Sequence, residues 1–361
     1  MENSIRLNFV MPFKARRPTG GFRVMYEYAN RLSDLGYDVH ITYPLKTKYM
    51  EYRLPYIARF ILSYIEGFRT SRWFDFRSNI SMCYTNSIND KNVKDSDIVI
   101  ATWWTTALEM GSLTEKKGRK INFIQGYENW IGHEDELHSS YDMEGVTNIV
   151  VASYLKDIVT KYTLNPTVLI PNAIDKEKYR ILNPIKDRNS LTVCMLYSIQ
   201  EIKGSTYGLE ALSKVKEKCS ELKVELFGIC PAPENLPDWI TFYRDPKDLS
   251  LIYNRNAIFI SNSLTEGMAL TPMEAMFCGC ATILTDIQGH AEYAKDNDTS
   301  LLYSPKDSSQ LVDKIMSLIT NNDNRIFLAE RGNHFIQQFS WDIAVEKMDR
   351  VIKELLHKKE V

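Results

Sequence analysis

Two carboxylates eight residues apart, Glu266 and Glu274, are the residues whose types and spacing point most directly to chemistry. They lie in the segment EGMALTPMEAMFCG, which follows a strand predicted over Ala257–Ser261 and opens a helix with Pro272 near its first turn, where proline is favoured. A loop between the end of a strand and the start of a helix presents backbone N–H groups to an anion. The two carboxylates can then bond two different sets of ligand hydroxyls.

Small side chains in the same loop favour close approach of a ligand. Gly267 and Ala269 leave the backbone accessible because neither carries a bulky group. The alternative is an ordinary loop–helix junction, in which Glu266 is solvated and Glu274 interacts favourably with the helix dipole. The segment by itself leaves both interpretations open.

Metal chemistry is the weaker interpretation of the acidic and thiol groups. Asp95-Ser96-Asp97 and Asp296-Asn297-Asp298 resemble metal-binding strings, but we interpret both as surface loops. The six cysteines include no CxxC pair, and no second Cys/His pair accompanies Cys278 and Cys280. We therefore expect free thiols in a reducing compartment, no cofactor and no metal ion.

The elements that would position these residues alternate between short apolar runs and helix-period segments, which is typical of βα units around a parallel sheet. In the first half the predicted strands are Ile5–Val10, Asp38–Thr42, Asp97–Ala101, Lys120–Ile124, Asn148–Ala152 and Thr167–Ile170. In the second half they are Leu191–Tyr197, Lys223–Phe227, Ala257–Ser261 and Ala281–Leu284, with helices over Thr206–Lys218, Pro272–Cys278, Ser308–Ile319 and Asn324–Phe339. Two doubly wound α/β domains meeting at a cleft are expected.

Composition excludes several classes of protein. The 361 residues are 44% hydrophobic and 25% charged, which is typical of globular proteins that fill two domains. A net charge of −2 without a dense Lys/Arg block argues against nucleic acid as a partner. We see no signal peptide and no apolar run of the roughly 20 residues that a membrane span needs. We expect a cytoplasmic protein, at most docked at the inner face of a membrane.

Taken together, several motifs resemble glycosyltransferase family 4, whose members are retaining enzymes of the two-Rossmann-domain GT-B type. The Glu-x7-Glu segment and the run Gly-His-Ala-Glu-Tyr at 289–293 resemble the family's donor-site signature. The other matches are Gly20-Gly21, the hinge-like Pro-Asn-Ala-Ile-Asp at 171–175, Lys203-Gly204 and Ser340-Trp341. The resemblance implies an N-terminal acceptor domain over 1–173, a linker over 174–189, a nucleotide-sugar domain over 190–338, and a C-terminal helix over 339–361 that returns toward the first domain.

The resemblance also implies roles for individual residues. Glu266 would bond the donor sugar and Glu274 the ribose of the nucleotide, while Lys203 would neutralise the departing diphosphate. Gly20 and Gly21 would let the backbone approach the phosphates. Backbone N–H groups would hold sugar and diphosphate oxygens at Met268, Ala269, Leu270 and Thr271.

Two departures from the family pattern concern the same chemistry. Ser198 stands where the family usually has an arginine, so a diphosphate contact is lost or comes from Arg16, Arg17 or Arg23. The strand that the family often follows with a histidine continues here into Gln-Gly-Tyr-Glu, as in a bacterial polysaccharide subgroup that resembles rhamnan-type transferases. Tyr127 and Glu128 are therefore taken as further catalytic candidates, with His133 and His290 as weaker ones.

A basic and aromatic stretch, Tyr52–Arg77, is a candidate membrane contact. Apolar side chains recur there at helical spacing among five arginines, a pattern that suits an anionic membrane surface. The alternative is a core-facing helix with a solvated basic face.

The sequence thus predicts a retaining hexosyl- or deoxyhexosyltransferase of cell-surface polysaccharide synthesis. It would move a sugar from a nucleotide-diphosphate sugar to a glycan or a polyprenyl-linked glycan. A sugar-nucleotide 2-epimerase of the same fold and a non-catalytic nucleotide-sugar-binding subunit remain as alternatives.

Overall fold

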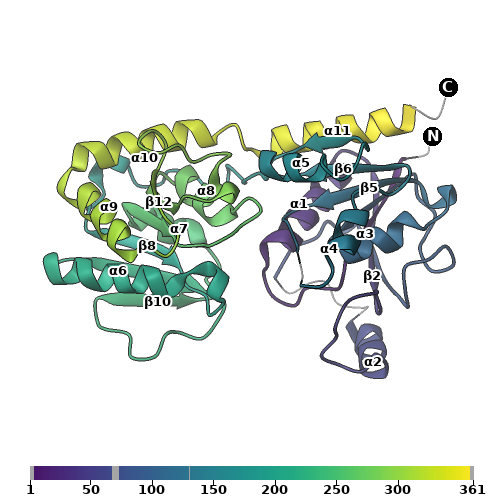
Figure 1. Cartoon of the computed structure of the whole chain (residues 1–361), viewed down its shortest axis with the longest axis horizontal. Coiled ribbons are helices and arrows are strands. Elements are labelled where there is room, and N and C mark those ends of the chain that lie inside the picture. Colours follow the sequence, from purple (N-terminus) through teal and green to yellow (C-terminus); the bar gives the residue numbers. More distant parts are fainter. Residues whose placement is uncertain (1–3, 67–72, 130, 358–361) are drawn as a thin grey trace. The chain divides into compact units, whose positions relative to one another are not determined.

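The chain folds into two compact units, which are described separately (Figure 1). The computed structural model describes residues 4–66, 73–129 and 131–357. Unit 1 contains the residues up to Asn172 together with those from Ala344 onward, and unit 2 contains Ala173–Ile343. Within the described residues, no helix is long and apolar enough to cross a bilayer.

Unit 1 is built on a parallel sheet with the strand order β3-β2-β1-β4-β5-β6-β7. The strands are β1 Arg6–Val10, β2 Asp38–Pro44, β3 Ser81–Thr85, β4 Ile98–Thr102, β5 Arg119–Ile124, β6 Val146–Val150 and β7 Thr167–Leu169. The order reverses between β1 and β4, and ligands of such sheets bind where the order reverses, beyond the carboxyl ends of the strands.

Helices connect these strands. They are α1 Gly20–Asp34, α2 Tyr56–Glu66, α3 Trp104–Gly111, α4 Glu134–Ser139 and α5 Ser153–Val159, with the short 3-10 turn η1 Glu115–Lys117. The C-terminal helix α11, Trp341–His357, belongs to this unit from Ala344 onward. Tyr37 ties it to the turn before β2 by donating a 2.6 Å hydrogen bond to Asp349.

Unit 2 repeats the arrangement with the order β10-β9-β8-β11-β12-β13, again all parallel. Its strands are β8 Thr192–Leu196, β9 Lys223–Gly228, β10 Ile240–Arg244, β11 Ile258–Ser261, β12 Ala281–Thr285 and β13 Leu301–Tyr303. Its helices are α6 Ser205–Lys218, α7 Leu249–Arg255, α8 Leu270–Phe277, α9 Ser308–Thr320 and α10 Asn322–Ile336, with 3-10 turns η2 Ile185–Asp187, η3 Glu201–Lys203 and η4 Gln288–His290. Here the order reverses between β8 and β11.

Each strand predicted from the sequence is present, with ends within two residues of the prediction. Three strands were missed: β3, β10 and β13. All three are edge strands, and β3 and β10 bury their side chains only partly, so neither of these two shows a continuous apolar run. The third spans only Leu301–Tyr303.

The stretch 174–189, expected as a linker, is part of unit 2. Ile185 lies in the hydrophobic core of that unit. Arg188 is also buried, and its guanidinium donates to the carbonyl oxygens of Tyr253, Asn256 and Cys278, where helices α7 and α8 end. Polar composition suggested a linker, but in the structure the Arg188 guanidinium binds carbonyls at the ends of two helices.

Candidate active site

The loop between β11 and α8 brings Glu266 into contact with Lys203. Lys203 ends the turn η3, which follows β8, and β8 is the neighbour of β11 at the point where the strand order reverses. The Lys203 ammonium lies 2.6 Å from Glu266 Oε1, and the hydroxyl of Ser263 donates to the same oxygen at 2.7 Å. Both charged side chains remain partly accessible. The structure therefore joins two of the predicted site residues into one charged pair.

Gly204 makes this approach possible. Its backbone is left-handed, with φ 58°, and a Cβ there would lie 2.1 Å from the carbonyl oxygen of Asn262, just beyond β11. Any larger residue would push η3 away from the loop that carries Glu266. The Lys-Gly pair noted in the sequence thus has a structural reason for its glycine.

Glu274 occupies a different environment, on the inner face of α8. It is only 1% exposed, and its Oε2 accepts a 3.1 Å hydrogen bond from the hydroxyl of Tyr253 on α7. Burial raises the pKa of Tyr253, so its hydroxyl stays protonated and can donate this hydrogen bond to the carboxylate. A buried carboxylate needs such donors, so Glu274 has a packing role whether or not it contacts a ligand.

The start of α8 is held against the turn η4. The N–H of Ala269 donates to the carbonyl of Gly289 at 3.4 Å, and the hydroxyl of Tyr293 donates to the carbonyl of Ala269 at 3.2 Å. Met268 is buried like Ala269, whereas Gly267, Leu270 and Thr271 are partly exposed. The Ala269 amide thus makes a long hydrogen bond within the protein.

His290, a weaker candidate from the sequence, is the last residue of the same turn η4. Its Nδ1 donates to the carbonyl of Thr285 at 2.8 Å, since a carbonyl can only accept. Burial lowers the pKa of His290, so the imidazole is neutral. Its Nε2 has no hydrogen-bond partner among the described residues. Gly289 packs directly on the backbone of Glu266, which places this histidine behind the Lys203–Glu266 pair.

In unit 1, Gly20 and Gly21 are the exposed first residues of α1, after β1. No side chain caps this helix from Thr19. Gln125, after β5, donates to the carbonyl of Gly21 at 3.1 Å and to Thr102 at 2.9 Å. The glycine pair therefore stands beside the carboxyl ends of β1, β4 and β5, where the strand order reverses.

Tyr127 and Glu128 are neighbours in sequence but face different partners. The hydroxyl of the exposed Tyr127 lies 3.1 Å from Nε2 of His138 on α4. Glu128 instead accepts a 3.3 Å hydrogen bond from the backbone N–H of Trp104, the first residue of α3. Burial raises the pKa of Glu128 to about 8. At neutral pH this carboxyl is mostly protonated, which suits a hydrogen-bond donor better than a base.

His133 packs against two aromatic rings. Its ring centroid lies 5.2 Å from that of Tyr49 and 5.7 Å from that of Trp104. A packing role explains this histidine without catalysis.

The two Asp-x-Asp strings carry ion pairs instead of converging on one point. Asp95 and Asp97 pair with Lys117 and Arg6, and their counterparts at 296 and 298 pair with Lys314 and Arg331. No group of three potential metal-ligating residues occurs in the part of the chain that the structure describes.

One family model matches most of unit 2. Residues 175–338 match the glycosyl transferases group 1. An uncharacterized glycosyltransferase of Methanocaldococcus jannaschii is 33% identical over 93 residues, 26% of either chain. A D-inositol 3-phosphate glycosyltransferase of Corynebacterium aurimucosum is 21% identical over 60% of this chain and 58% of its own. O-antigen chain mannosyltransferase B of Escherichia coli is 27% identical over 29% of this chain and 27% of its own. The alignments span less than two thirds of each relative.

Solved structures resemble the chain along nearly its whole length. The complex of Anabaena HepE with UDP and glucose has a TM-score of 0.71 at 12% identity, covering 97% of this chain and all of the other. Sucrose-phosphate synthase of Thermosynechococcus elongatus has a TM-score of 0.71 at 14% identity, covering 98% of this chain and all of the other. At such identities the likeness concerns the fold. Together with the two Rossmann-like units, it confirms the predicted GT-B fold.

Proposed function

We propose that this chain, whose residues 175–338 match the glycosyl transferases group 1, moves a sugar from a nucleotide-diphosphate donor to a glycan or lipid-linked glycan in cell-surface polysaccharide synthesis. The sugar is a hexose or a deoxyhexose, and relatives that include polysaccharide mannosyltransferases support a hexose. The observation that carries the proposal is the Lys203–Glu266 pair, which lies where the strand order of unit 2 reverses.

The chemistry assigned to this pair follows from its charges. The bond between the anomeric carbon and the donor's phosphate oxygen breaks, and negative charge develops on the leaving diphosphate. Lys203, released from Glu266, neutralises that charge, and the N–H groups at the start of α8 assist. Glu266 bonds the sugar hydroxyls, and Glu274 holds the ribose. No metal ion is needed in this scheme.

Retention follows if the acceptor attacks on the face that the diphosphate leaves. A new bond forms from the acceptor oxygen to the anomeric carbon, and the acceptor's proton passes to the departing phosphate oxygen. The raised pKa of Glu128 agrees with this route, because a carboxyl that is mostly protonated at neutral pH is a poor base. We assign Gly20 and Gly21 to close backbone approach to the phosphates, and Tyr127 and Glu128 to the acceptor side.

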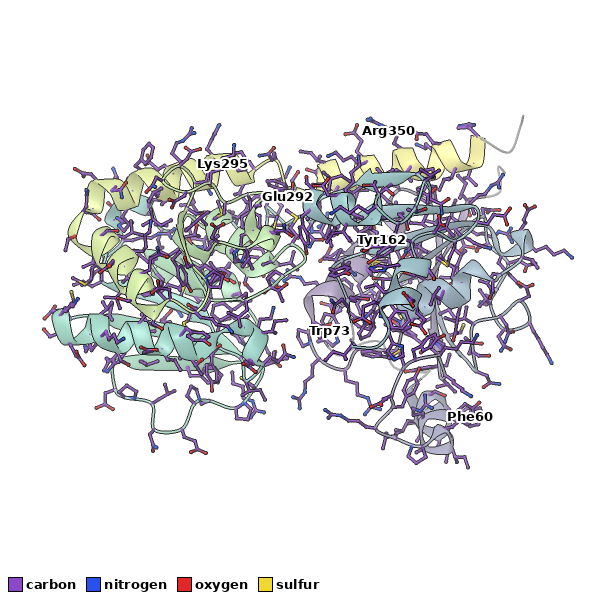
Figure 2. The ribbon with its side chains drawn as sticks, in the orientation of Figure 1. Phe60, Trp73, Tyr162, Glu292, Lys295 and Arg350 are labelled. Atoms are coloured by element: carbon purple, nitrogen blue, oxygen red, sulfur yellow. The ribbon has the colours of Figure 1, made fainter. Side chains whose placement is uncertain are left out.

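Helix α2 supports a peripheral contact with an anionic membrane on the cytoplasmic side. Its residues Ile57 and Tyr64 are each 72% exposed, and Phe60, Ile61 and Ile65 are about half exposed. Figure 2 labels Phe60 on this helix. These positions share one helical face, so the helix presents apolar surface outward. Arg69 and Arg72, part of the predicted contact, lie outside the described residues. Such docking would place the enzyme beside a polyprenyl-linked acceptor.

A binding screen tests the donor proposal. UDP, GDP, dTDP and CDP, free and as sugar conjugates, are added in turn, and the unfolding temperature is followed. A nucleotide at 100 times its dissociation constant adds about 2.7 kcal/mol to the folded state. We expect one base to be preferred, and transfer or slow hydrolysis of its sugar conjugate.

Three other outcomes separate the alternatives. Interconversion of the donor sugar at its C2 position would identify an epimerase. Binding without turnover toward any acceptor would identify a non-catalytic subunit. Failure of every nucleotide to bind would overturn the assignment of unit 2 as a donor domain.

A further inference from the structure

A small cavity lies at the carboxyl ends of β4 and β5 in unit 1. Its walls include Trp103 and Trp104, which follow β4, Glu128, which follows β5, and Tyr141. The space is about the size of one water molecule or one hydroxyl group. A whole sugar ring cannot enter it, but one substituent of a ring can.

Two polar groups meet in this cavity. The hydroxyl of Tyr141 is buried and has no hydrogen-bond partner among the described residues. Among the described residues, the carboxyl of Glu128 accepts a hydrogen bond only from the N–H of Trp104. Burial raises the pKa of Tyr141, and the nearby charge of Glu128 raises it further. Buried polar groups are normally satisfied, so an orphaned tyrosine hydroxyl beside a carboxyl indicates a missing polar ligand.

Strained backbone carries one aromatic residue that lines the cavity, Trp103, and one that packs on the lining residue Trp104, Tyr49. Trp103 has φ 77° and Tyr49 has φ 61°, values that bulky side chains rarely adopt. Trp103 is partly exposed and lies 5.6 Å from the exposed ring of Phe13, which follows β1. Tyr49 lies 5.3 Å from Trp104. Strain that persists in a folded protein is concentrated at functional sites.

The chemistry of the walls selects the ligand. No lysine or arginine lines the cavity among the described residues, and Glu128 resists ionisation there, so a phosphate or carboxylate has no counter-ion. A neutral hydroxyl can accept from Tyr141 and donate to the carboxyl of Glu128. The apolar face of a ring that carries this hydroxyl can lie against Trp103 and Phe13, the arrangement usual in pockets that combine aromatic walls with few polar groups.

We propose that this corner of unit 1 is the subsite for one pyranose ring of the acceptor glycan. One ring hydroxyl enters the cavity and bonds to Glu128 and Tyr141, and one ring face packs on Trp103. The inference rests on the proposed function in that it takes the acceptor to be a glycan. The subsite itself is defined by residues of unit 1 alone.

Saturation-transfer NMR tests the subsite. The probes are the methyl pyranosides of glucose, galactose, mannose and N-acetylglucosamine, with sorbitol as an acyclic polyol control. At least one pyranoside should bind the intact protein with a dissociation constant between about 1 and 20 mM, and sorbitol should not. Ring protons of one face should receive the strongest transfer.

Two variants remove the subsite without opening the core. Trp103→Gly deletes the ring and relieves the positive φ, and Tyr141→Phe deletes only the orphaned hydroxyl. Each should weaken pyranoside binding at least fivefold. Tyr243→Phe on the edge strand β10 of unit 2 is the matched control and should bind like the wild type.

The proposal fails if no pyranoside binds the wild type, or if both variants bind as tightly as it does. Nucleotide binding by the same samples separates this failure from that of the proposed function. Nucleotide binding with no pyranoside binding removes only the subsite. Pyranoside binding with no nucleotide binding leaves the subsite and removes the transferase.

Discussion

Lys203 shows most directly how a single charge governs the proposed reaction. In the structure it neutralises Glu266, and in the reaction it neutralises a diphosphate whose charge grows as the glycosyl bond breaks. Interactions that strengthen toward the transition state affect turnover more than ground-state binding. We expect Lys203→Ala to lower kcat by about 100-fold or more while donor KM changes far less.

Steady-state kinetics with the preferred donor measures this effect. Lys214→Ala is the matched control, because that lysine forms an exposed pair with Glu210 on α6. A kcat of Lys203→Ala within twofold of the wild type would remove this lysine from the mechanism.

Glu128 should make the protein less stable as the pH rises. Its pKa is about 8 in the folded protein against an ordinary 4.5, so between these values the folded state holds a proton that the unfolded chain has released. Stability therefore falls across that window. Over the three units from pH 5 to pH 8, the free energy of unfolding would fall by about 4 kcal/mol if solvent did not screen the group. The carboxyl is only half-buried, so we expect a loss of roughly 2 kcal/mol.

Urea unfolding at pH 5 and pH 8 checks this prediction. Glu128→Gln cannot ionise, so its stability relative to the wild type should increase with pH. An equal difference at both pH values would show that the carboxyl titrates normally.

At the scale of elements, the turn η3 depends on Gly204. The backbone at Gly204 is left-handed, a conformation that strains any residue with a Cβ. A Cβ at this position would also collide with the carbonyl oxygen of Asn262. Gly36, which follows α1, has φ 94° but open space around its Cα. We expect Gly204→Ala to destabilise unit 2 by about 3 kcal/mol or more, against about 1 kcal/mol for Gly36→Ala in unit 1. Calorimetric unfolding of both variants measures these losses of stability. An equal loss in the two variants would mean that η3 can shift to accommodate the added Cβ.

Helix α2 is the element on which membrane docking depends. Ile57→Glu places a charge on its exposed apolar face, so binding to anionic vesicles at low salt should fall severalfold in co-sedimentation. Leu164→Glu adds the same charge at a fully exposed site elsewhere in unit 1 and should have little effect. If the wild type stays in the supernatant at low salt, α2 has another role and a soluble acceptor becomes the better hypothesis.

For the molecule as a whole, we expect activity to survive EDTA. The leaving diphosphate is assigned to Lys203 and backbone amides, and the Asp-x-Asp carboxylates of the described residues are paired with cations. Transfer assays with and without chelator measure this directly. Activity that EDTA abolishes and Mg²⁺ or Mn²⁺ restores would contradict the scheme and direct attention to Asp95 and Asp97, or to Asp296 and Asp298.

The local elements could be predicted from the sequence because burial imposes a local pattern. Strands such as β4, whose residues are all buried, read as apolar runs between helix-period segments. The loop from Glu266 to Glu274 was likewise visible, since a strand, a small-residue loop and a proline-started helix are consecutive in the chain. The edge strands β3 and β10 were not predicted because their side chains are only partly buried, and partial burial leaves a weak apolar pattern.

Tertiary structure alone decided which of these residues meet. Lys203 and Glu266 are brought together only because β8 and β11 are neighbours, an order that no local pattern specifies. The surroundings of Glu128 likewise depend on α3, so its pKa and the cavity beside it could not be read from neighbours in sequence. Local periodicity encodes elements, whereas contacts, burial and proton affinity arise from segments that the fold brings close.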